Sequence, residues 1–192
     1  MEATQTKIPD VLIIEPDVYK DQRGFFMETY NEKRYHELGI DVRFVQDNLS
    51  FSIQNTLRGL HYQYPNAQAK LVSVIHGEVF DVVVDIRQGS PTFGKWTGAR
   101  LSGDNKRQLF APVGFAHGYC VLSETAIFQY KCSNFYSPKD EKGILWNDPD
   151  LNITWLVTSP LLSDKDKENP SLSNVTQESL PAYEHQVQSP PY

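Results

Sequence analysis

Several features that would narrow the class of this protein are scarce in its sequence. Only two cysteines occur among the 192 residues, Cys120 and Cys132, which excludes a small scaffold held together by disulfides. Both lie in β-like runs beside aromatic residues, so we expect two buried thiols in a reducing cytoplasm. The longest apolar stretches, such as Val82–Val84, fall far short of the roughly 20 residues of a membrane-spanning helix. No basic segment followed by an apolar one opens the chain, so we expect a cytoplasmic protein with no membrane partner.

An excess of positive charge is also missing. Lysine and arginine together number 18 against 24 aspartates and glutamates, which gives a net charge of −6. Nucleic-acid binders need a basic face to displace the counterions of phosphates, so we expect no nucleic-acid partner. A phosphate-bearing ligand must instead be met by a few placed cations. The sequence also contains no glycine-rich phosphate loop and no serine nucleophile elbow.

What the sequence does contain is an apolar pattern typical of strands. Hydrophobic residues make up 40% and charged residues 22% of a chain whose length suits one domain. Short β-branched and aromatic runs alternate with turn residues at roughly 8–12-residue spacing, which predicts an all-β sandwich or barrel. His76-Gly77-Glu78 further predicts a hairpin between two of these runs. We expect strands at Val11–Ile14, Gly24–Tyr30, Phe44–Phe51, Lys70–Ile75, Val79–Arg87, Gly94–Leu101, Arg107–Ala111, Gly118–Leu122 and Ala126–Tyr136.

Helices are expected at two places only, and the last part of the chain differs in composition. Asn31 precedes Glu32–Leu38 as a helix N-cap, and Ser163 is a possible cap for a second short helix. From about residue 169 proline, serine, glutamine and glutamate replace large apolar residues. We therefore divide the chain into a domain over residues 1–168 and an extension over residues 169–192. The extension is expected to be loosely attached or disordered, with an added interface strand as the alternative.

Two stretches of the sequence contain histidines that are candidate catalytic residues. The first, Leu57–Gln63, contains His61. A single histidine in a strand is more often structural, but imidazole is also the side chain best suited to general base catalysis near neutral pH. Pro112–His117 has the P-x-G-x-x-H spacing of the second cupin motif. The first cupin motif of a metal enzyme would need a histidine where Gln63 stands, and the next carboxylate is as far away as Glu78. We therefore expect no metal, and acid–base chemistry without a dinucleotide.

Seven short motifs then occur in order between Ile8 and Leu172. They are Asp21–Phe26, Phe44–Asn48, Leu57–His61, Asp81–Arg87, Phe115–Gly118, Tyr130-Lys131 and Trp146–Pro149. With these motifs the sequence closely resembles the dTDP-4-dehydrorhamnose 3,5-epimerase family, which consists of dimeric, metal-free cupins of dTDP-L-rhamnose synthesis. The resemblance implies a cupin jelly-roll β-barrel with a few short peripheral helices. It also implies a homodimer, no cofactor, and a dTDP-linked 4-keto-6-deoxy sugar as substrate.

The activity implied by the resemblance is the inversion of C3 and C5 of dTDP-4-dehydro-6-deoxy-D-glucose to give dTDP-4-dehydro-L-rhamnose. The C4 ketone acidifies both C–H bonds, so a base can form an enolate and an acid on the opposite face can return a proton. His61 matches the family's base, Tyr130 its acid, and Lys70 the cation beside the C4 oxygen. Asp166 matches the carboxylate that orients the histidine, and Asp164 competes for that role.

The resemblance also implies a set of residues that hold the substrate. Two arginines would bind the diphosphate, polar residues the base and deoxyribose, and tyrosines would stack on thymine. In the family some of these side chains reach the site from the dimer partner. The positions that match are Tyr19, Arg23, Glu28, Gln46, Asp47, Asn48, Arg58, Lys70, His117, Tyr136, Glu141 and Lys165.

Other functions are compatible with parts of this pattern. An enzyme of the same family that inverts only C3 could use the same base and acid. A 3,4-ketoisomerase fits less well, because the contexts of His61 and Tyr130 resemble those of epimerases. A non-catalytic cupin that only binds a nucleotide sugar would need no histidine and tyrosine on opposite sides of a cavity. A metal-dependent cupin dioxygenase is disfavoured by Gln63.

Overall fold

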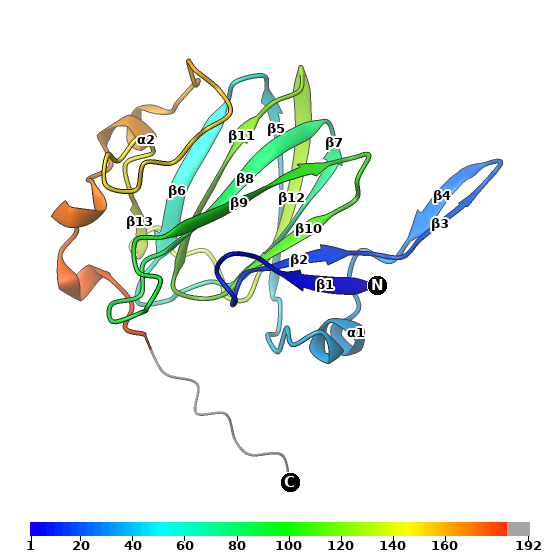
Figure 1. Cartoon of the computed structure of the whole chain (residues 1–192), viewed down its shortest axis with the longest axis horizontal. Coiled ribbons are helices and arrows are strands. Elements are labelled where there is room, and N and C mark those ends of the chain that lie inside the picture. Colours follow the sequence, from blue (N-terminus) through cyan, green and yellow to red (C-terminus); the bar gives the residue numbers. More distant parts are fainter. Residues whose placement is uncertain (184–192) are drawn as a thin grey trace, which may run out of the picture.

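The structure, a computed structural model, describes residues 1–183. Two antiparallel sheets face one another and form a jelly-roll-like sandwich, while a separate two-stranded hairpin projects from one side (Figure 1). The all-β jelly-roll prediction is confirmed, but the sheets do not close into a barrel. The reason is that, among the described residues, no hydrogen-bonded ladder joins an edge strand of one sheet to an edge strand of the other.

Each sheet mixes strands from distant parts of the chain. The first sheet runs in the order β1 (Glu2–Gln5), β2 (Leu12–Glu15), β10 (Gln108–Ala111), β7 (Lys70–His76), β12 (Thr125–Cys132) and β5 (Gln46–Ile53). The second runs in the order β13 (Glu141–Gly143), β6 (Leu57–Gln63), β11 (Phe115–Val121), β8 (Glu78–Asp85) and β9 (Trp96–Ser102). The projecting hairpin consists of β3 (Val18–Asp21) and β4 (Gly24–Met27). The chain therefore crosses repeatedly between the two layers.

The predicted hairpin around Gly77 illustrates these crossings. A turn is present, because Gly77 has φ +78° and a Cβ there would collide with the backbone of Thr125. The strands on either side do not pair, however: β7 lies between β10 and β12, and β8 lies between β11 and β9. The prediction of a hairpin is wrong, because β7 and β8 belong to different sheets and each pairs with other strands there. The short strands β1, β3 and β13, which were not predicted, are polar or lie at sheet edges.

The core lies on both faces of β8. Because side chains alternate along a strand, Val83 packs between the two sheets with Val72, while Val82 packs on the opposite face of its own sheet. That opposite face is covered by segments from the C-terminal part of the chain, including Leu172 and Leu180. Burial on both faces explains why this strand is almost continuously apolar.

Both predicted helices form, and both are short. The first, α1 (Glu32–Glu37), is capped by Asn31, whose side chain accepts a hydrogen bond from the backbone of Arg34. The second, α2 (Asp164–Glu168), is capped in the same way by Ser163. No helix among residues 1–183 is long and apolar enough to cross a membrane.

The two cysteines behave as the sequence indicates. Cys120 lies on β11 and Cys132 on β12, so they belong to different sheets. Both thiols are free and buried. They are therefore small packing residues and not a disulfide.

The described part of the C-terminal extension packs against the domain. Leu172 and Leu180 are buried, and the backbone N–H of Leu172 donates a 2.6 Å hydrogen bond to the buried carboxylate of Asp148. Two 3-10 helices lie there, η1 (Leu172–Asn174) and η2 (Gln177–Ser179). The expectation of a loose attachment does not hold for residues 169–183, because these few apolar side chains complete the outer core. The rest of the extension lies outside the described residues.

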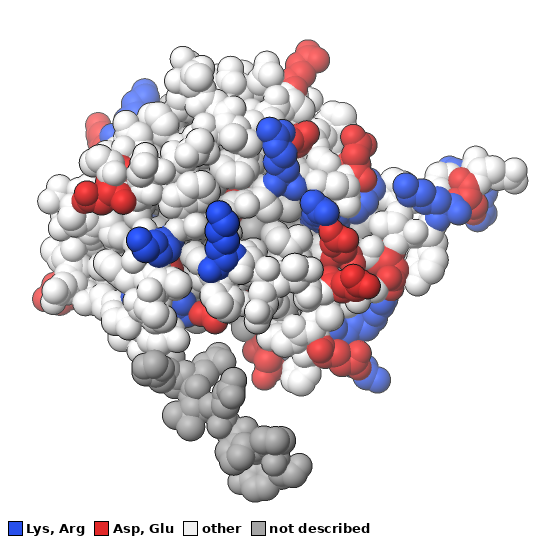
Figure 2. Space-filling model, in the orientation of Figure 1, with Lys and Arg blue, Asp and Glu red and all other residues white. Residues whose placement is uncertain are grey.

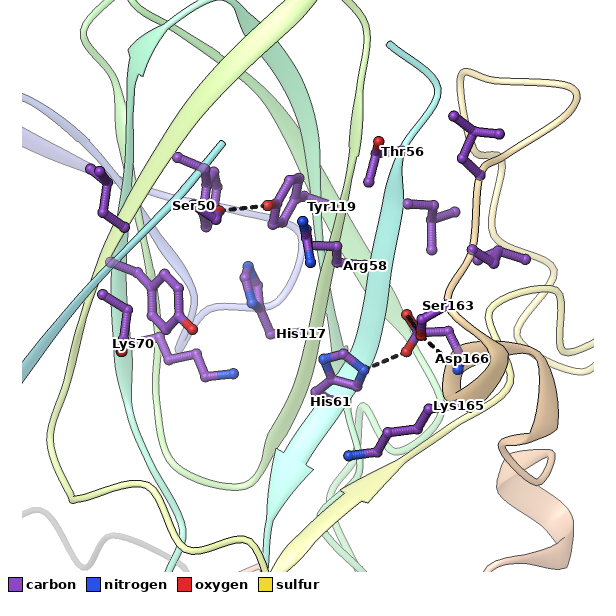
Figure 3. Close-up of a pocket in the computed structure, with 17 residues that line it drawn as sticks. Ser50, Thr56, Arg58, His61, Lys70, His117, Tyr119, Ser163, Lys165 and Asp166 are labelled. Carbon is purple, nitrogen blue, oxygen red and sulfur yellow. Dashed lines mark hydrogen bonds and ion pairs between the residues drawn. The ribbon is translucent and has the colours of Figure 1, made fainter. Parts of the chain in front are cut away.

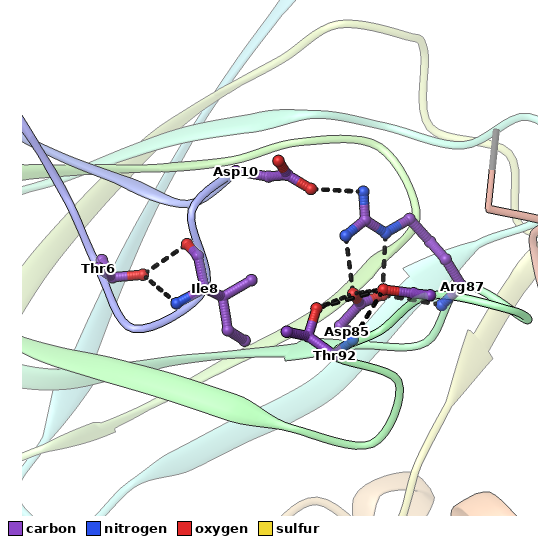
Figure 4. Close-up of polar contacts among 7 residues, drawn as sticks. Thr6, Ile8, Asp10, Asp85, Arg87 and Thr92 are labelled. Atoms are coloured by element: carbon purple, nitrogen blue, oxygen red, sulfur yellow. Dashed lines mark hydrogen bonds and ion pairs between the residues drawn. The ribbon is translucent and has the colours of Figure 1, made fainter. Parts of the chain in front are cut away.

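A polar cluster around Arg87 joins three distant segments, and Figure 4 shows the contacts with two of them, at Asp10 and Asp85. The guanidinium pairs with Asp85 at 2.7 Å and with Asp10 at 2.8 Å. It also lies 4.3 Å from the ring centroid of Phe115 and 4.9 Å from that of Tyr183. The N-terminal loop, the end of β8 and the C-terminal segment are thus held by one side chain.

Candidate active site

A cavity of about 560 Å³ opens between the two sheets and is bounded by β5, β6, β7, β11, β12 and α2 (Figure 3). A second hollow of about 330 Å³ adjoins it. Asn48, His61, Lys70 and Tyr130 line both hollows. The two hollows therefore adjoin along these four residues, and we describe them together as one site.

His61 enters this cavity from the second sheet because of its register. It lies directly opposite His117 on the neighbouring strand β11, and side chains that face each other across antiparallel strands point to the same side of the sheet. Both histidines therefore face the first sheet and the cavity between them. The imidazole of His61 remains partly exposed, at 29%.

The carboxylate of Asp166 holds the imidazole of His61. Its Oδ1 atom lies 2.5 Å from Nε2 of His61 (Figure 3). Ser163 fixes the carboxylate in turn: its hydroxyl donates to Oδ2 of Asp166 at 2.8 Å and accepts the backbone N–H of Asp166 at 3.1 Å. With Nε2 occupied by Asp166, Nδ1 of His61 is the nitrogen left for a ligand in the cavity.

The competing aspartate is placed quite differently. The side chain of Asp164 is 94% exposed and pairs with Lys167 at 2.8 Å. Asp166 is buried on the opposite side of the same short helix. Of the two aspartates, Asp166 alone contacts the histidine among the described residues.

The electrostatics of Asp166 suit a carboxylate that stays ionised. Burial raises its pKa, but the hydrogen bond and charge of His61, together with Ser163 and Lys165, outweigh this effect and leave the pKa below its usual value. An ionised carboxylate at this position can hold one imidazole nitrogen in its protonated form. It can also stabilise the imidazolium that forms when the other nitrogen takes up a proton.

Tyr130 and Lys70 face His61 from the other sheet. Lys70 is paired with Cys132, two residues beyond Tyr130, so Lys70 and Tyr130 point to the same face. The ammonium of Lys70 lies 5.9 Å from the ring centroid of Tyr130. The cavity is thus bounded by an imidazole on one side and by a phenol with an ammonium on the other.

Burial shifts the pKa values of Tyr130 and Lys70 in opposite directions. It raises the pKa of Tyr130 to about 12, so the phenol keeps its proton at neutral pH and can act as a donor. It lowers the pKa of Lys70 below the usual value, although nearby groups that include Asp81 oppose the shift. Both effects come from the removal of water from the charged form.

Sequence reasoning gave no role to Asp81, which the structure places beneath the site. Its carboxylate is fully buried, and its Oδ2 atom lies 2.9 Å from Nε2 of His117. The signal was present, because Asp81 is a charged residue inside the otherwise apolar run of β8. Ser50 and Tyr119 were also missed; their hydroxyls lie 2.9 Å apart and both line the cavity.

The smaller hollow is lined by five of the twelve residues expected to hold the substrate, namely Gln46, Asn48, Lys70, Tyr136 and Glu141. Oε2 of Glu141 lies 2.7 Å from the hydroxyl of Tyr136, which donates to it, and 2.5 Å from Nζ of Lys165. Gln46 accepts the backbone N–H of Tyr136 at 2.9 Å and donates to Asn48 at 3.0 Å. The side chains linked by these contacts form a connected rim at one end of the cavity.

Arg58 and Asp47 differ in how far they reach the cavity. Arg58 lines it and donates only to the hydroxyl of Ser52, at 3.2 Å, with no carboxylate partner among residues 1–183. Its charge is therefore available to an anionic ligand. Asp47 does not line the cavity; it is exposed and pairs with Lys131 at 2.9 Å, because it alternates with Asn48 along β5 and points outward.

Three predicted binding residues lie away from this cavity. Tyr19 and Arg23 belong to the projecting hairpin, and Glu28 follows its second strand (Figure 1). Arg23 pairs with Asp21 at 2.6 Å, and Glu28 pairs with Arg34 at 2.8 Å. The hairpin points away from the body, so none of the three lines the cavity of its own chain.

Two further observations bear on the ligand. Among residues 1–183, no group of three or more histidine, cysteine, aspartate or glutamate side chains is arranged to hold a metal ion. On the face shown in Figure 2, basic and acidic side chains are interspersed, without a continuous basic surface. The cations placed to meet an anionic ligand are those that line the cavity, namely Arg58, Lys70 and Lys165.

Comparison with known proteins agrees with this geometry. The family model for dTDP-4-dehydrorhamnose 3,5-epimerase matches residues 5–174. The chain belongs to this family. It is accordingly an isomerase of the carbohydrate epimerase type. Its similarity extends over the two sheets, the cavity and α2.

Individual members of the family show how close the similarity is. The dTDP-4-dehydrorhamnose 3,5-epimerase of Shigella flexneri is 61% identical over 168 residues, which cover 86% of this chain and 93% of the relative. The crystal structure of an epimerase from Legionella pneumophila in complex with dTDP-4-keto-L-rhamnose has a TM-score of 0.93 and 53% identity, and covers 95% of this chain and 98% of that one. A dTDP-4-dehydrorhamnose 3-epimerase of Streptomyces niveus is 41% identical and covers 84% of this chain and 79% of the relative.

Proposed function

We propose that this chain converts dTDP-4-dehydro-6-deoxy-D-glucose to dTDP-4-dehydro-L-rhamnose by inverting C3 and C5. The observation that carries the proposal is the placement of His61 and Tyr130 on facing sheets, where both line one cavity. Inversion at carbon requires that a proton leave one face of the sugar and return to the other. A base and an acid on opposite walls supply that arrangement.

The proton transfers follow from the atoms available. Nδ1 of His61 takes the proton from C3 or C5, and the electron pair of the broken C–H bond forms the enolate of the C4 ketone. The phenol of Tyr130 gives its proton to the same carbon from the other face. His61 then releases its proton to solvent and Tyr130 regains one, which restores the enzyme. Asp166 stabilises the imidazolium form of His61 between these steps.

The enolate oxygen needs positive charge beside it. Lys70 and His117 both line the cavity, between the positions of the base and the acid. An ammonium or an imidazole N–H directed at the C4 oxygen stabilises the enolate more than the ketone, and this lowers the barrier to proton removal. The buried carboxyl group of Asp81 lies 2.9 Å from Nε2 of His117 and opposes the lowering of the pKa of Lys70 by burial.

The nucleotide would occupy the rest of the site. Arg58 has no carboxylate partner in the described chain and suits the diphosphate. The ring of Tyr136 is half exposed at the end of the smaller hollow, where it can stack on thymine. Gln46, Asn48 and Glu141 offer the amide and carboxylate groups that hydrogen-bond a base and a deoxyribose.

Inversion at C3 alone is the second candidate. It is favoured by the similarity to the Streptomyces niveus relative, which is described as a 3-epimerase. The same base and acid can serve both reactions. The difference lies in whether the enolate intermediate turns in the cavity so that C5 also reaches His61.

Incubation with dTDP-4-dehydro-6-deoxy-D-glucose in deuterated water tests these reactions. Deuterium at both C3 and C5 of the product supports the double inversion, and deuterium at C3 alone supports the second candidate. Pure, folded protein that binds dTDP yet exchanges no proton would contradict both. Nuclear magnetic resonance of the product measures the position of the label.

We also propose that the enzyme is a homodimer in which the hairpin of one protomer completes the site of the other. Tyr19, Phe25 and Phe26 on this hairpin are each more than half exposed, an unusual concentration of free aromatic surface. Tyr19 and Arg23 match substrate-binding positions of the family but lie outside the cavity of their own chain. A second copy of the chain, placed by a twofold axis, accounts for both facts.

The size of the particle in solution tests the dimer. Sedimentation of the wild-type protein should give the mass of two chains. The variant Phe26→Asp should shift the equilibrium toward the monomer, whereas Glu178→Lys, an exposed change on η2 at the other side of the molecule, should not (Figure 1). A wild-type protein that remains monomeric at high concentration would contradict the proposal.

The cytoplasm is the compartment that we propose for this enzyme. Two free, buried thiols agree with a reducing compartment. A cell fractionation that followed the epimerase activity would test it. Activity confined to a secreted or periplasmic fraction would exclude the cytoplasm.

A further inference from the structure

A glycine stands directly opposite the proposed base. Gly143 on β13 pairs with His61 on β6. Opposed residues of antiparallel strands present their side chains to the same side of the sheet. A side chain at position 143 would therefore project to the side of the sheet on which α2 carries Asp166.

The space that this side chain would occupy is already filled. A Cβ atom at Gly143 would come closer than 3.0 Å to Oδ1, Cγ and Nδ2 of Asn169. Asn169 is the residue at which α2 ends. Its Nδ2 atom is buried and has no hydrogen-bond partner among the described residues. For this amide nitrogen the described residues thus provide close packing against Gly143 and no hydrogen bond.

The position of α2 depends on such contacts because the helix is only five residues long. A helix of this length has little stability of its own. Ser163 fixes its first turn to Asp166, and the carbonyl of Pro170 accepts the backbone N–H of Leu145 at 2.8 Å just after its end. Between these anchors, the side chain of Asn169 lies directly against Gly143 of β13.

We propose that Gly143 is a positioning residue: its missing side chain lets α2 sit close enough for Asp166 to hold His61. This role rests on the proposed function of His61 as the base. A methyl group at position 143 would push Asn169 and the end of α2 outward. The 2.5 Å contact between Nε2 of His61 and Oδ1 of Asp166 would then lengthen or break.

The variant Gly143→Ala tests this role together with a compensating change. We expect kcat of Gly143→Ala to fall on the order of 10²-fold, as for a displacement of about 1 Å in a catalytic group. The affinity for dTDP, measured by calorimetry, should fall far less than kcat, because Arg58 and Tyr136 lie on other elements and, of the expected binding residues, only Lys165 is carried by α2. In Gly143→Ala/Asn169→Ala the methyl group has room, and kcat should recover. The control is Lys142→Ala, which leaves the same alanine one position away on the opposite face of β13 and adds no atom next to Asn169.

A second readout does not depend on turnover. The proton shared by His61 and Asp166 should give a far-downfield imidazole N–H resonance in the wild type, which His61→Ala identifies by its loss. This resonance should shift or broaden in Gly143→Ala and return in the double variant. If Gly143→Ala does not fold, the double variant decides: folded protein with the resonance supports the role, and unfolded protein contradicts it.

The outcomes separate this inference from the proposed function. A wild-type protein without exchange activity would contradict the function, and the resonance would still test Gly143. An active wild type with an equally active Gly143→Ala variant would overturn the positioning role alone. A double variant as impaired as Gly143→Ala would overturn it as well, because the contact with Asn169 would not be the cause.

Discussion

Asp81 and His117 form a buried pair beneath the cavity, with Nε2 of His117 2.9 Å from Oδ2 of Asp81 and both side chains at most 7% exposed. The two residues lie on neighbouring strands of the second sheet, β8 and β11. His117 also lines the cavity, whereas Asp81 does not. Asp81 therefore acts on the site through the histidine and through its charge.

The first prediction concerns this pair. Asp81→Asn keeps the shape of the side chain but replaces the carboxyl group that lies 2.9 Å from Nε2 of His117 and opposes the effect of burial on the pKa of Lys70. We expect the free energy of unfolding to fall by about 3 kcal/mol, because a buried pair loses one of its two partners. Urea denaturation at neutral pH measures this change. Asp164→Asn, at an exposed aspartate, is the control and should be close to neutral; equal stabilities for the two variants would refute the expectation.

The second prediction tests the base. His61→Ala should lower the rate of deuterium exchange at C3 and C5 by a factor on the order of 10²–10⁴. Binding of dTDP should remain, because the nucleotide end of the cavity is formed by other side chains. Exchange followed by nuclear magnetic resonance and binding followed by calorimetry separate the two effects. Near-normal turnover in this variant would mean that another group is the base.

The third prediction separates the acid from the base. Tyr130→Phe removes the phenolic proton but leaves His61 and Asp166 in place. We expect His61 to continue to remove a proton and to return a deuteron to the same face, so exchange should persist while inversion falls on the order of 10²-fold. Comparing the label in recovered substrate with the label in product measures the difference. Equal loss of exchange and inversion would argue against an opposite-face donor at Tyr130.

The fourth prediction uses two defective variants together. In a dimer whose hairpins are exchanged, each site combines His61 of one protomer with Arg23 of the other. The variants Arg23→Ala and His61→Ala therefore remove residues that different protomers supply to the same site. A hybrid dimer then has one site with both residues intact and one site with neither. Mixing the two variants after dissociation should restore about a quarter of the wild-type activity. If the mixture is no more active than its components, the hairpin does not serve the partner's site.

The fifth prediction concerns acid stability away from the active site. Burial raises the pKa of Asp85, but hydrogen bonds from Arg87, Ser90 and Thr92 outweigh it, so the pKa lies below its usual value. The stabilisation from Asp85 is therefore fully present above about pH 4 and is lost as the pH falls through the depressed pKa. Asp85→Asn should be about 3 kcal/mol less stable at neutral pH. This difference should shrink in acid when thermal unfolding is followed across pH, and a constant difference would contradict it.

Local sequence patterns were enough to place most of the strands and both helices. Alternation marks the positions of β5, β9 and β12, because it records which side chains face the core. Caps mark the helices, since Asn31 and Ser163 satisfy backbone N–H groups that the helix leaves free. These signals depend only on neighbours along the chain.

Pairing between distant segments could not be predicted from local sequence patterns. The turn at Gly77 was visible, but its flanking strands separate into different sheets, which depends on partners elsewhere in the chain. The packing of Leu172 and Leu180 was hidden by the polar residues around them. Two apolar side chains suffice to anchor a segment when the surface that they cover is already formed.

The residues of the candidate site show the same difference between local sequence signals and long-range packing. The family resemblance pointed to His61 and Asp166, yet the residues around Asp166 alone read as a solvated run of charge. What distinguishes Asp166 from Asp164 is the side of a five-residue helix on which each lies, and this depends on how α2 packs. Asp81 was overlooked because its role depends on a neighbour 36 residues away, His117.

The separation of 105 residues between His61 and Asp166 has a consequence for the order of events during synthesis. Domains fold as the chain emerges, beginning with its N-terminal part. His61 would leave the ribosome before its neighbouring strands β11 and β13 and before Asp166 have been made. Both sheets could assemble before residue 163 is made, and such a chain would be folded but without a working base. If His61 is the base, as we propose, α2 is the element that completes its pair with Asp166 after the strands of both sheets have been made.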